Sequence, residues 1–114
     1  MGGLAVILGA FAAHGLRAVL SDRMLTAFET GAQYQMYHAL AIGLAALAVR
    51  DRAARLANAA AALFLIGIAL FSGSLYLMAF TGLTFLGMVT PLGGLSMMAG
   101  WAVLALAALK LEKA

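Results

Sequence analysis

The sequence predicts an all-α, polytopic membrane protein, a single domain of four transmembrane helices in an antiparallel bundle. Of its 114 residues, 66% are hydrophobic and only 10% are charged, which is more apolar surface than one small water-soluble core buries. Charged residues separate three long uncharged runs, 1–16, 30–49 and 56–109, of 16, 20 and 54 residues. Because a spanning helix needs about 20 residues, the last run is long enough for two.

The first two helices are expected at about residues 1–16 and 22–49. At ~1.5 Å per residue the first reaches only ~24 Å, less than a hydrocarbon core of ~30 Å. Either the bilayer thins around this helix or the helix extends beyond the start of the chain. The second helix has a favourable beginning, because Ser21 can cap it and Asp22 suits its first turn.

The third and fourth helices are expected at about residues 53–80 and 91–109, with a turn between them. Glycines, threonines and the only proline gather at Thr81-Gly82-Leu83-Thr84 and Thr90-Pro91-Leu92-Gly93-Gly94. Proline disfavours helix in the residues before it and suits the first turn of a new helix.

Basic residues predict the orientation of the helices. Four crossings put Arg50, Arg52, Arg55, Lys110 and Lys113 on one side and two arginines, at positions 17 and 23, on the other. We expect the protein in the inner (plasma) membrane of the cell. Since cytoplasmic loops carry the excess of Lys and Arg, both termini are expected in the cytoplasm.

Composition excludes several classes of function. There is no cysteine, which excludes disulfides and thiolate metal sites, and seven Lys and Arg against four Asp and Glu are too dispersed for nucleic-acid binding. No cofactor is expected, and ligation of a metal by two histidines at unequal depths is disfavoured. Small residues recur every four positions at Ala5, Gly9 and Ala13 and again at Ser96 and Gly100. They indicate bundle packing more strongly than a specific dimer seam.

Polar side chains are concentrated in the second helix. With Glu29 at 0° and 100° per residue, six hydrogen-bonding side chains fall within one half of the helix surface, ending with His38 at 180°. Serines and a tyrosine of the third helix are expected at a similar depth. The candidate ligand site is therefore an outward-opening polar cluster of His14, Glu29, Gln33, Tyr34, Tyr37, His38, Ser72 and Tyr76.

Four interpretations of this cluster remain open. Buried polar groups in membranes need partners whatever the function, so an internal hydrogen-bond network that sets helix register is favoured. A pocket for a small polar molecule or lipid headgroup is the second, and proton or ion movement past Glu29 the third. Metal or haem ligation is the fourth. A catalytic triad has the residue types but no accompanying motif, so the protein is not expected to be an enzyme.

The chain resembles the YgdD/YwdK-like family of small bacterial inner-membrane proteins, a family of unknown function with a relative in animal mitochondria. The matching stretches are Gly9 to Leu16, Phe28 to Leu40, Phe71 to Tyr76, Thr90 to Gly94 and Gly100-Trp101. The resemblance implies a four-helix inner-membrane protein without an established reaction or catalytic residues. One departure is at the amino end, where relatives have a basic residue or two before the first helix.

These expectations favour a non-enzymatic protein with a structural, accessory or envelope-stabilising role. Its expected partners are the lipid bilayer and either further copies of itself, as a homo-oligomer, or a larger membrane complex. The alternative is a binder or carrier of a small polar molecule or lipid headgroup at the outward-facing cluster.

Overall fold

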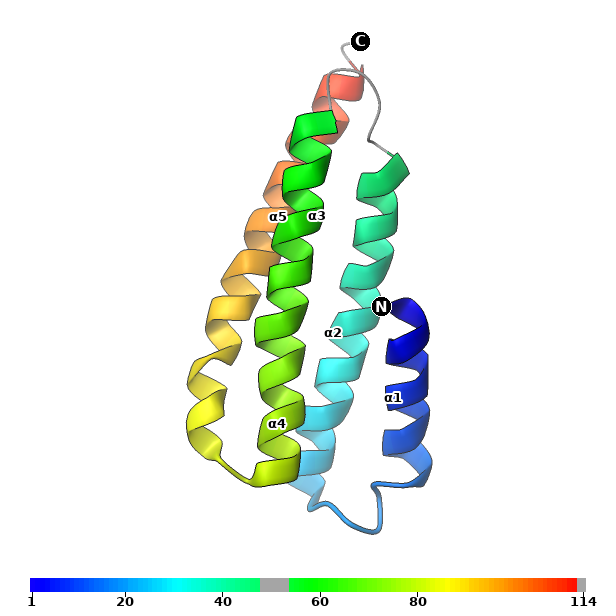
Figure 1. Cartoon of the computed structure of the whole chain (residues 1–114), viewed down its shortest axis with the longest axis vertical. Helices are drawn as coiled ribbons and strands as arrows, with labels where there is room; N and C mark the ends of the chain where they lie inside the picture. The colour runs from blue at the N-terminus through cyan, green and yellow to red at the C-terminus, as the bar shows by residue number, and fades with distance from the viewer. Residues whose placement is uncertain (48–53, 113–114) are drawn as a thin grey trace.

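The computed structural model describes residues 1–47 and 54–112, and it is helical almost throughout (Figure 1). The α-helices are α1 (Gly2–His14), α2 (Asp22–Leu47), α3 (Ala54–Gly67), α4 (Gly73–Thr81) and α5 (Thr90–Glu112). A π-helical turn, η2 (Ile68–Ser72), joins α3 to α4 without a break, and a 3-10 turn, η3 (Thr84–Met88), precedes α5. The described residues contain no strand, which confirms the predicted all-α class.

The helices lie side by side in a flattened arrangement of 53 × 26 × 14 Å (Figure 1). Helix α1 packs against α2, which packs on its other side against α3, η2 and α4. Helix α5 packs along α3 and η2. Because α1 is short, it lies beside only the half of α2 that is nearer to the α1–α2 connection.

Local sequence explains where the helices begin and end. The hydroxyl of Ser21 accepts a hydrogen bond from the backbone N–H of Met24 (3.3 Å), as expected for a residue that caps α2. Gly82 ends α4 in the left-handed conformation (φ 72°), which glycine adopts without steric cost. Pro91 lies in the first turn of α5, where its missing N–H leaves no hydrogen bond unmade.

Small residues allow α5 to approach α3 and η2 closely. A Cβ on Gly93 would lie 2.3 Å from the backbone nitrogen of Phe71, and one on Gly100 would lie 2.7 Å from the ring of Phe64. Between them, the hydroxyl of Ser96 donates to the carbonyl of Leu63 (2.7 Å). The predicted small-residue ridge of Ser96 and Gly100 therefore packs within the molecule, as membrane helices commonly do.

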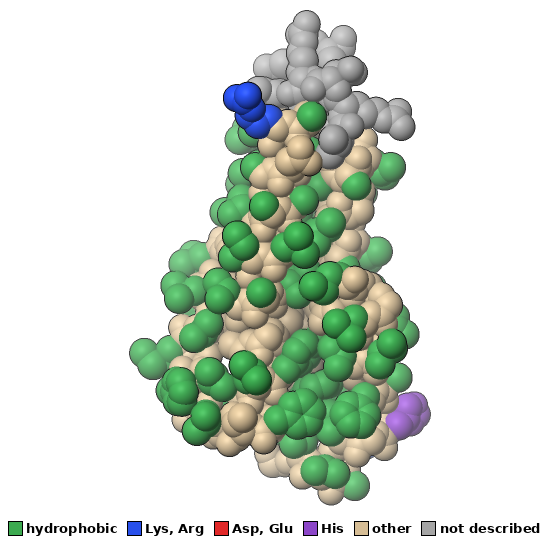
Figure 2. All heavy atoms as spheres, viewed as in Figure 1, with side chains coloured by type: hydrophobic (Ala, Val, Ile, Leu, Met, Phe, Trp, Pro, Cys, Tyr) green, Lys and Arg blue, Asp and Glu red, His purple; other side chains and the backbone are tan. Residues whose placement is uncertain are grey.

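The surface is predominantly apolar, and the face shown in Figure 2 carries hydrophobic side chains over most of its length. Among the described residues, two helical segments are long and apolar enough to cross a membrane, Ala54–Thr81 and Thr84–Leu109. Helix α1 is apolar but has only 13 residues. Helix α2 has 26 residues and carries the polar side chains from which the candidate site was predicted.

Candidate functional site

His38 is the centre of a buried hydrogen-bond chain between α2 and α5. Its Nε2 accepts a hydrogen bond from the indole N–H of Trp101 (3.1 Å), and its Nδ1 lies 2.7 Å from the carbonyl oxygen of Tyr34. Because an indole nitrogen only donates, Nε2 is the acceptor and Nδ1 carries the proton that is donated to Tyr34. Both ring nitrogens are therefore engaged in hydrogen bonds within the protein.

Aromatic rings surround His38 and form the wall of a hollow between α2 and α5. The ring centroid of Phe64 lies 5.6 Å from that of His38, and the Trp101 and Tyr34 centroids each lie 6.0 Å away. The hollow has a volume of about 400 Å³. Its lining residues are Tyr34, His38, Phe71, Gly94, Met97, Met98 and Trp101. It is mostly apolar, since the polar atoms of His38 already have partners within the protein.

Gln35 is the second buried polar centre of α2. Its Oε1 accepts a hydrogen bond from the hydroxyl of Tyr76 on α4 (2.7 Å), and its Nε2 donates to the carbonyl oxygen of Met1 (2.9 Å). Gln35 thus ties α2 to both α1 and α4 and is only 2% exposed. Gln35 is not part of the predicted cluster, because at 240° on the same scale it falls outside the polar half of the helix.

The end of the π-helical turn η2 and the start of α4 each bring a further hydroxyl into the interior. Ser72 donates to the carbonyl oxygen of Gly31 on α2 (2.7 Å), where a Cβ on Gly31 would lie 2.8 Å from the ring of Tyr76. Ser74 lies 2.6 Å from the hydroxyl of Thr90 at the start of α5. The π-turn therefore lies where hydrogen bonds connect α2, α4 and α5. Such turns often occur at functional sites.

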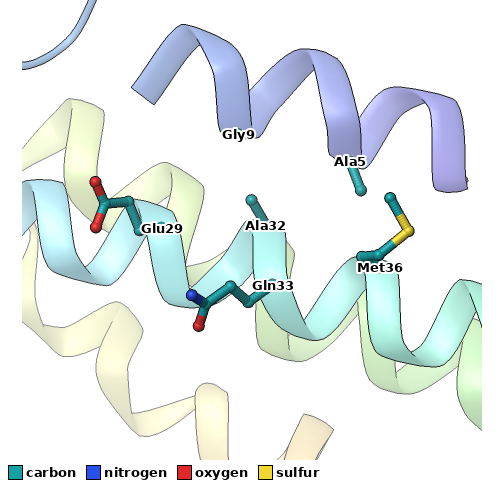
Figure 3. Close-up of a pocket in the computed structure, with 6 residues that line it drawn as sticks. All are labelled: Ala5, Gly9, Glu29, Ala32, Gln33 and Met36. Carbon is teal, nitrogen blue, oxygen red and sulfur yellow. The ribbon is translucent and has the colours of Figure 1, made fainter. Parts of the chain in front are cut away.

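Glu29 and Gln33 lie elsewhere, at a groove between α1 and α2 (Figure 3). The groove has a volume of about 280 Å³, and Ala5 and Gly9 of α1 form its smooth opposite wall. Gln33 is exposed and Glu29 is partly buried. The groove is polar at the end formed by these two side chains and apolar toward Met36.

The structure therefore does not gather the eight predicted residues into one pocket, and that part of the prediction is corrected. Glu29 and Gln33 line the α1–α2 groove, whereas Tyr34 and His38 line the hollow beside α5. Ser72 and Tyr76 bond to groups on α2 inside the protein, His14 is exposed at the end of α1, and Tyr37 is 52% exposed. The helical wheel gives directions on α2 correctly but cannot say which direction faces a neighbouring helix.

The donor set for a metal is sparse in the described part of the chain. Nowhere among the side chains of residues 1–47 and 54–109 do three or more His, Asp or Glu come close enough together to hold an ion. His14 and His38 lie on different helices and have different surroundings, one exposed and one buried.

Comparison with known proteins gives one consistent result. Residues 8–94 match the family described as "Protein of unknown function (DUF423)". The chain is 43% identical over 109 residues to the UPF0382 membrane protein YwdK of Bacillus subtilis, which covers 94% of this chain and 88% of that protein. It is 44% identical over 106 residues to a UPF0382 membrane protein of Haemophilus influenzae (92% and 84% covered). Identity to the UPF0382 inner membrane protein YgdD of Escherichia coli is 38% over 108 residues (95% and 82% covered). No solved structure matches the chain.

Proposed function

Since this chain belongs to the DUF423 family, whose named relatives are membrane proteins, we propose that it is a non-enzymatic structural or accessory protein of the inner membrane. It acts as a homo-oligomer or as a small subunit that stabilises a complex of the cell envelope. In this proposal the chain crosses the bilayer four times and keeps both termini in the cytoplasm.

The observation that carries the proposal is that the buried polar side chains have hydrogen-bond partners within the protein. His38, Gln35 and Ser72 are each 5% exposed or less, and each has a partner on another helix. In the described residues, no buried side-chain nitrogen or oxygen lacks a hydrogen bond. Polar groups arranged in this way fix the register of packed helices, as expected for a structural role.

Charge distribution supports the proposed orientation. Arg55 lies in the first turn of α3, at the end of the molecule where α5 ends, and Arg23 lies in the first turn of α2, at the opposite end (Figure 1). Arg50 and Arg52, which contributed to the predicted excess of positive charge, lie outside the described residues. With the termini in the cytoplasm, a cysteine replacing Arg23 is expected to react with a membrane-impermeant maleimide in intact spheroplasts. A cysteine replacing Arg55 should react only after lysis, and the reverse pattern would overturn the orientation.

Native mass spectrometry of the detergent-extracted protein tests the role. A mass corresponding to several copies, or to this chain with stoichiometric partner chains, supports a structural or accessory protein. A bare monomer that is also recovered as a monomer from lipid nanodiscs contradicts it.

The second candidate function is binding or carriage of a small polar molecule or lipid headgroup. The observation that favours it is the α1–α2 groove, where the Glu29 carboxylate and Gln33 amide border an apolar channel. A ligand held there should appear as a reproducible added mass that Glu29→Gln removes. His38→Ala, which alters a residue outside this groove, is the control and should leave the added mass in place.

A further inference from the structure

Helix α2 has a polar face that is exposed at Gln33 and Tyr37 and partly buried at Glu29. Glu29, Gln33 and Tyr37 follow one another at intervals of four residues, one helical turn apart, and form what we call the outer stripe. In the described part of the chain, the α2 side chains that make hydrogen bonds are Thr30, whose hydroxyl donates to the carbonyl oxygen of Thr26 (2.9 Å), Gln35 and His38. Within residues 1–47 and 54–112, the outer stripe contributes none.

The position of the outer stripe along α2 makes this exposure unfavourable in lipid. At ~1.5 Å per residue, Glu29 lies ~10 Å and Tyr37 ~22 Å from the start of a helix ~39 Å long. A hydrocarbon core of ~30 Å centred on α2 would contain all three side chains. Polar side chains at such depth almost always face protein or a water-filled cavity, because lipid tails offer no hydrogen bonds.

We propose that a second copy of this chain packs against the outer stripe, forming an α2–α2 seam centred on Gln33. This inference rests on the homo-oligomeric form of the proposed function and identifies its interface. Two side chains of the stripe are complementary to themselves, because the Gln33 amide and the Tyr37 hydroxyl can each both donate and accept a hydrogen bond. A second copy inserted in the same orientation also holds its stripe at the same depth in the bilayer.

The shape of this face is suited to such packing. The outer stripe forms a ridge with a hollow on each side, the α1–α2 groove of about 280 Å³ and the α2–α5 hollow of about 400 Å³. Ridges of one helix pack into grooves beside another, and in a two-fold dimer the same surface serves both partners. Amide side chains that face each other across such an axis hydrogen-bond between transmembrane helices.

Disulfide crosslinking tests the seam on a clean background, because the chain has no cysteine. Leu40 lies three turns beyond Glu29 on the same face and is 63% exposed, whereas Leu106 is 53% exposed on α5. Leu40→Cys and Leu106→Cys are each reconstituted in vesicles at low protein-to-lipid ratio and oxidised. The seam predicts at least tenfold more crosslinked dimer for Leu40→Cys than for the control.

Variants of the outer stripe make the test specific. In the Leu40→Cys protein, Gln33→Leu should reduce crosslinking at least tenfold, Gln33→Asn should retain most of it, and Tyr37→Phe should give an intermediate loss. Equal crosslinking at the control position, or no effect of Gln33→Leu, would place the interface elsewhere and leave the homo-oligomer intact. No crosslinking at either position, together with a monomeric native mass, would overturn both the seam and the homo-oligomer.

Discussion

Among the glycines in the described part of the chain, Gly93 has the least space for a side chain, and it gives the most direct test of the packing. Gly93 of α5 lies against the backbone of Phe71 in the π-turn, and a Cβ there would approach the Phe71 nitrogen to 2.3 Å. Ordinary contacts begin at about 3.4 Å, so α5 would have to move by about 1 Å. Phe71 cannot turn aside, because the atoms in the way belong to its backbone. We expect Gly93→Ala to destabilise the fold by about 3 kcal/mol, at the upper end of overpacking costs.

The adjacent glycine provides a matched control. A Cβ on Gly94 would meet nothing closer than 3.9 Å, and alanine is favoured over glycine in a helix by up to about 1 kcal/mol. Both variants change the unfolded chain in the same way, so their difference isolates the contact with Phe71. Thermal unfolding in detergent, followed by Trp101 fluorescence, should show Gly94→Ala at or above the native midpoint and Gly93→Ala well below it. Equal midpoints for the two variants would refute the described approach of α5 to η2.

Two further predictions concern the buried hydrogen bonds. Trp101→Phe keeps an aromatic ring but removes the donor to His38 Nε2, and unfolding in detergent should show a loss of about 1 kcal/mol. An unchanged melting curve would mean that this bond contributes nothing. Gln35→Met leaves the Tyr76 hydroxyl without its acceptor and should cost about 1–3 kcal/mol, whereas the double variant with Tyr76→Phe should recover part of that loss. Strictly additive losses in the two single variants would show that the two groups are not coupled.

The helical class could be predicted from the sequence because lipid excludes charge. Uncharged runs mark where helices can lie, and the cluster around Gly82 and Pro91 marks where the last run turns. The π-turn could not be predicted in this way. Phe71 within the turn lies against Gly93 of α5, a contact between segments more than 20 residues apart. No local pattern around residues 68–72 specifies it.

The candidate site was predicted less completely, for a physical reason. A helical wheel groups polar residues by direction, and it grouped His38 with Glu29 and Gln33 while leaving out Gln35. The direction that is buried depends on the neighbours, and α1 and α4 lie on the side of α2 to which Gln35 points. His38, at the edge of the predicted stripe, is buried because α5 extends Trp101 toward it.

Helix α2 thus has polar groups on two opposite sides, and the two sides differ in one respect. Gln35 meets bonding partners on α1 and α4, whereas Gln33, two residues earlier and about 200° around the helix, meets none in the described part of the chain. Both amides lie at membrane depth, where lipid tails offer no hydrogen bonds. An unpaired amide therefore costs the same free energy at either position. The Gln35 amide is stabilised by hydrogen bonds to neighbouring helices. The Gln33 amide needs a neighbouring helix for the same reason. The described part of a single copy does not supply a helix that bonds to Gln33. A second copy supplies one, because its own Gln33 amide can donate and accept the hydrogen bonds.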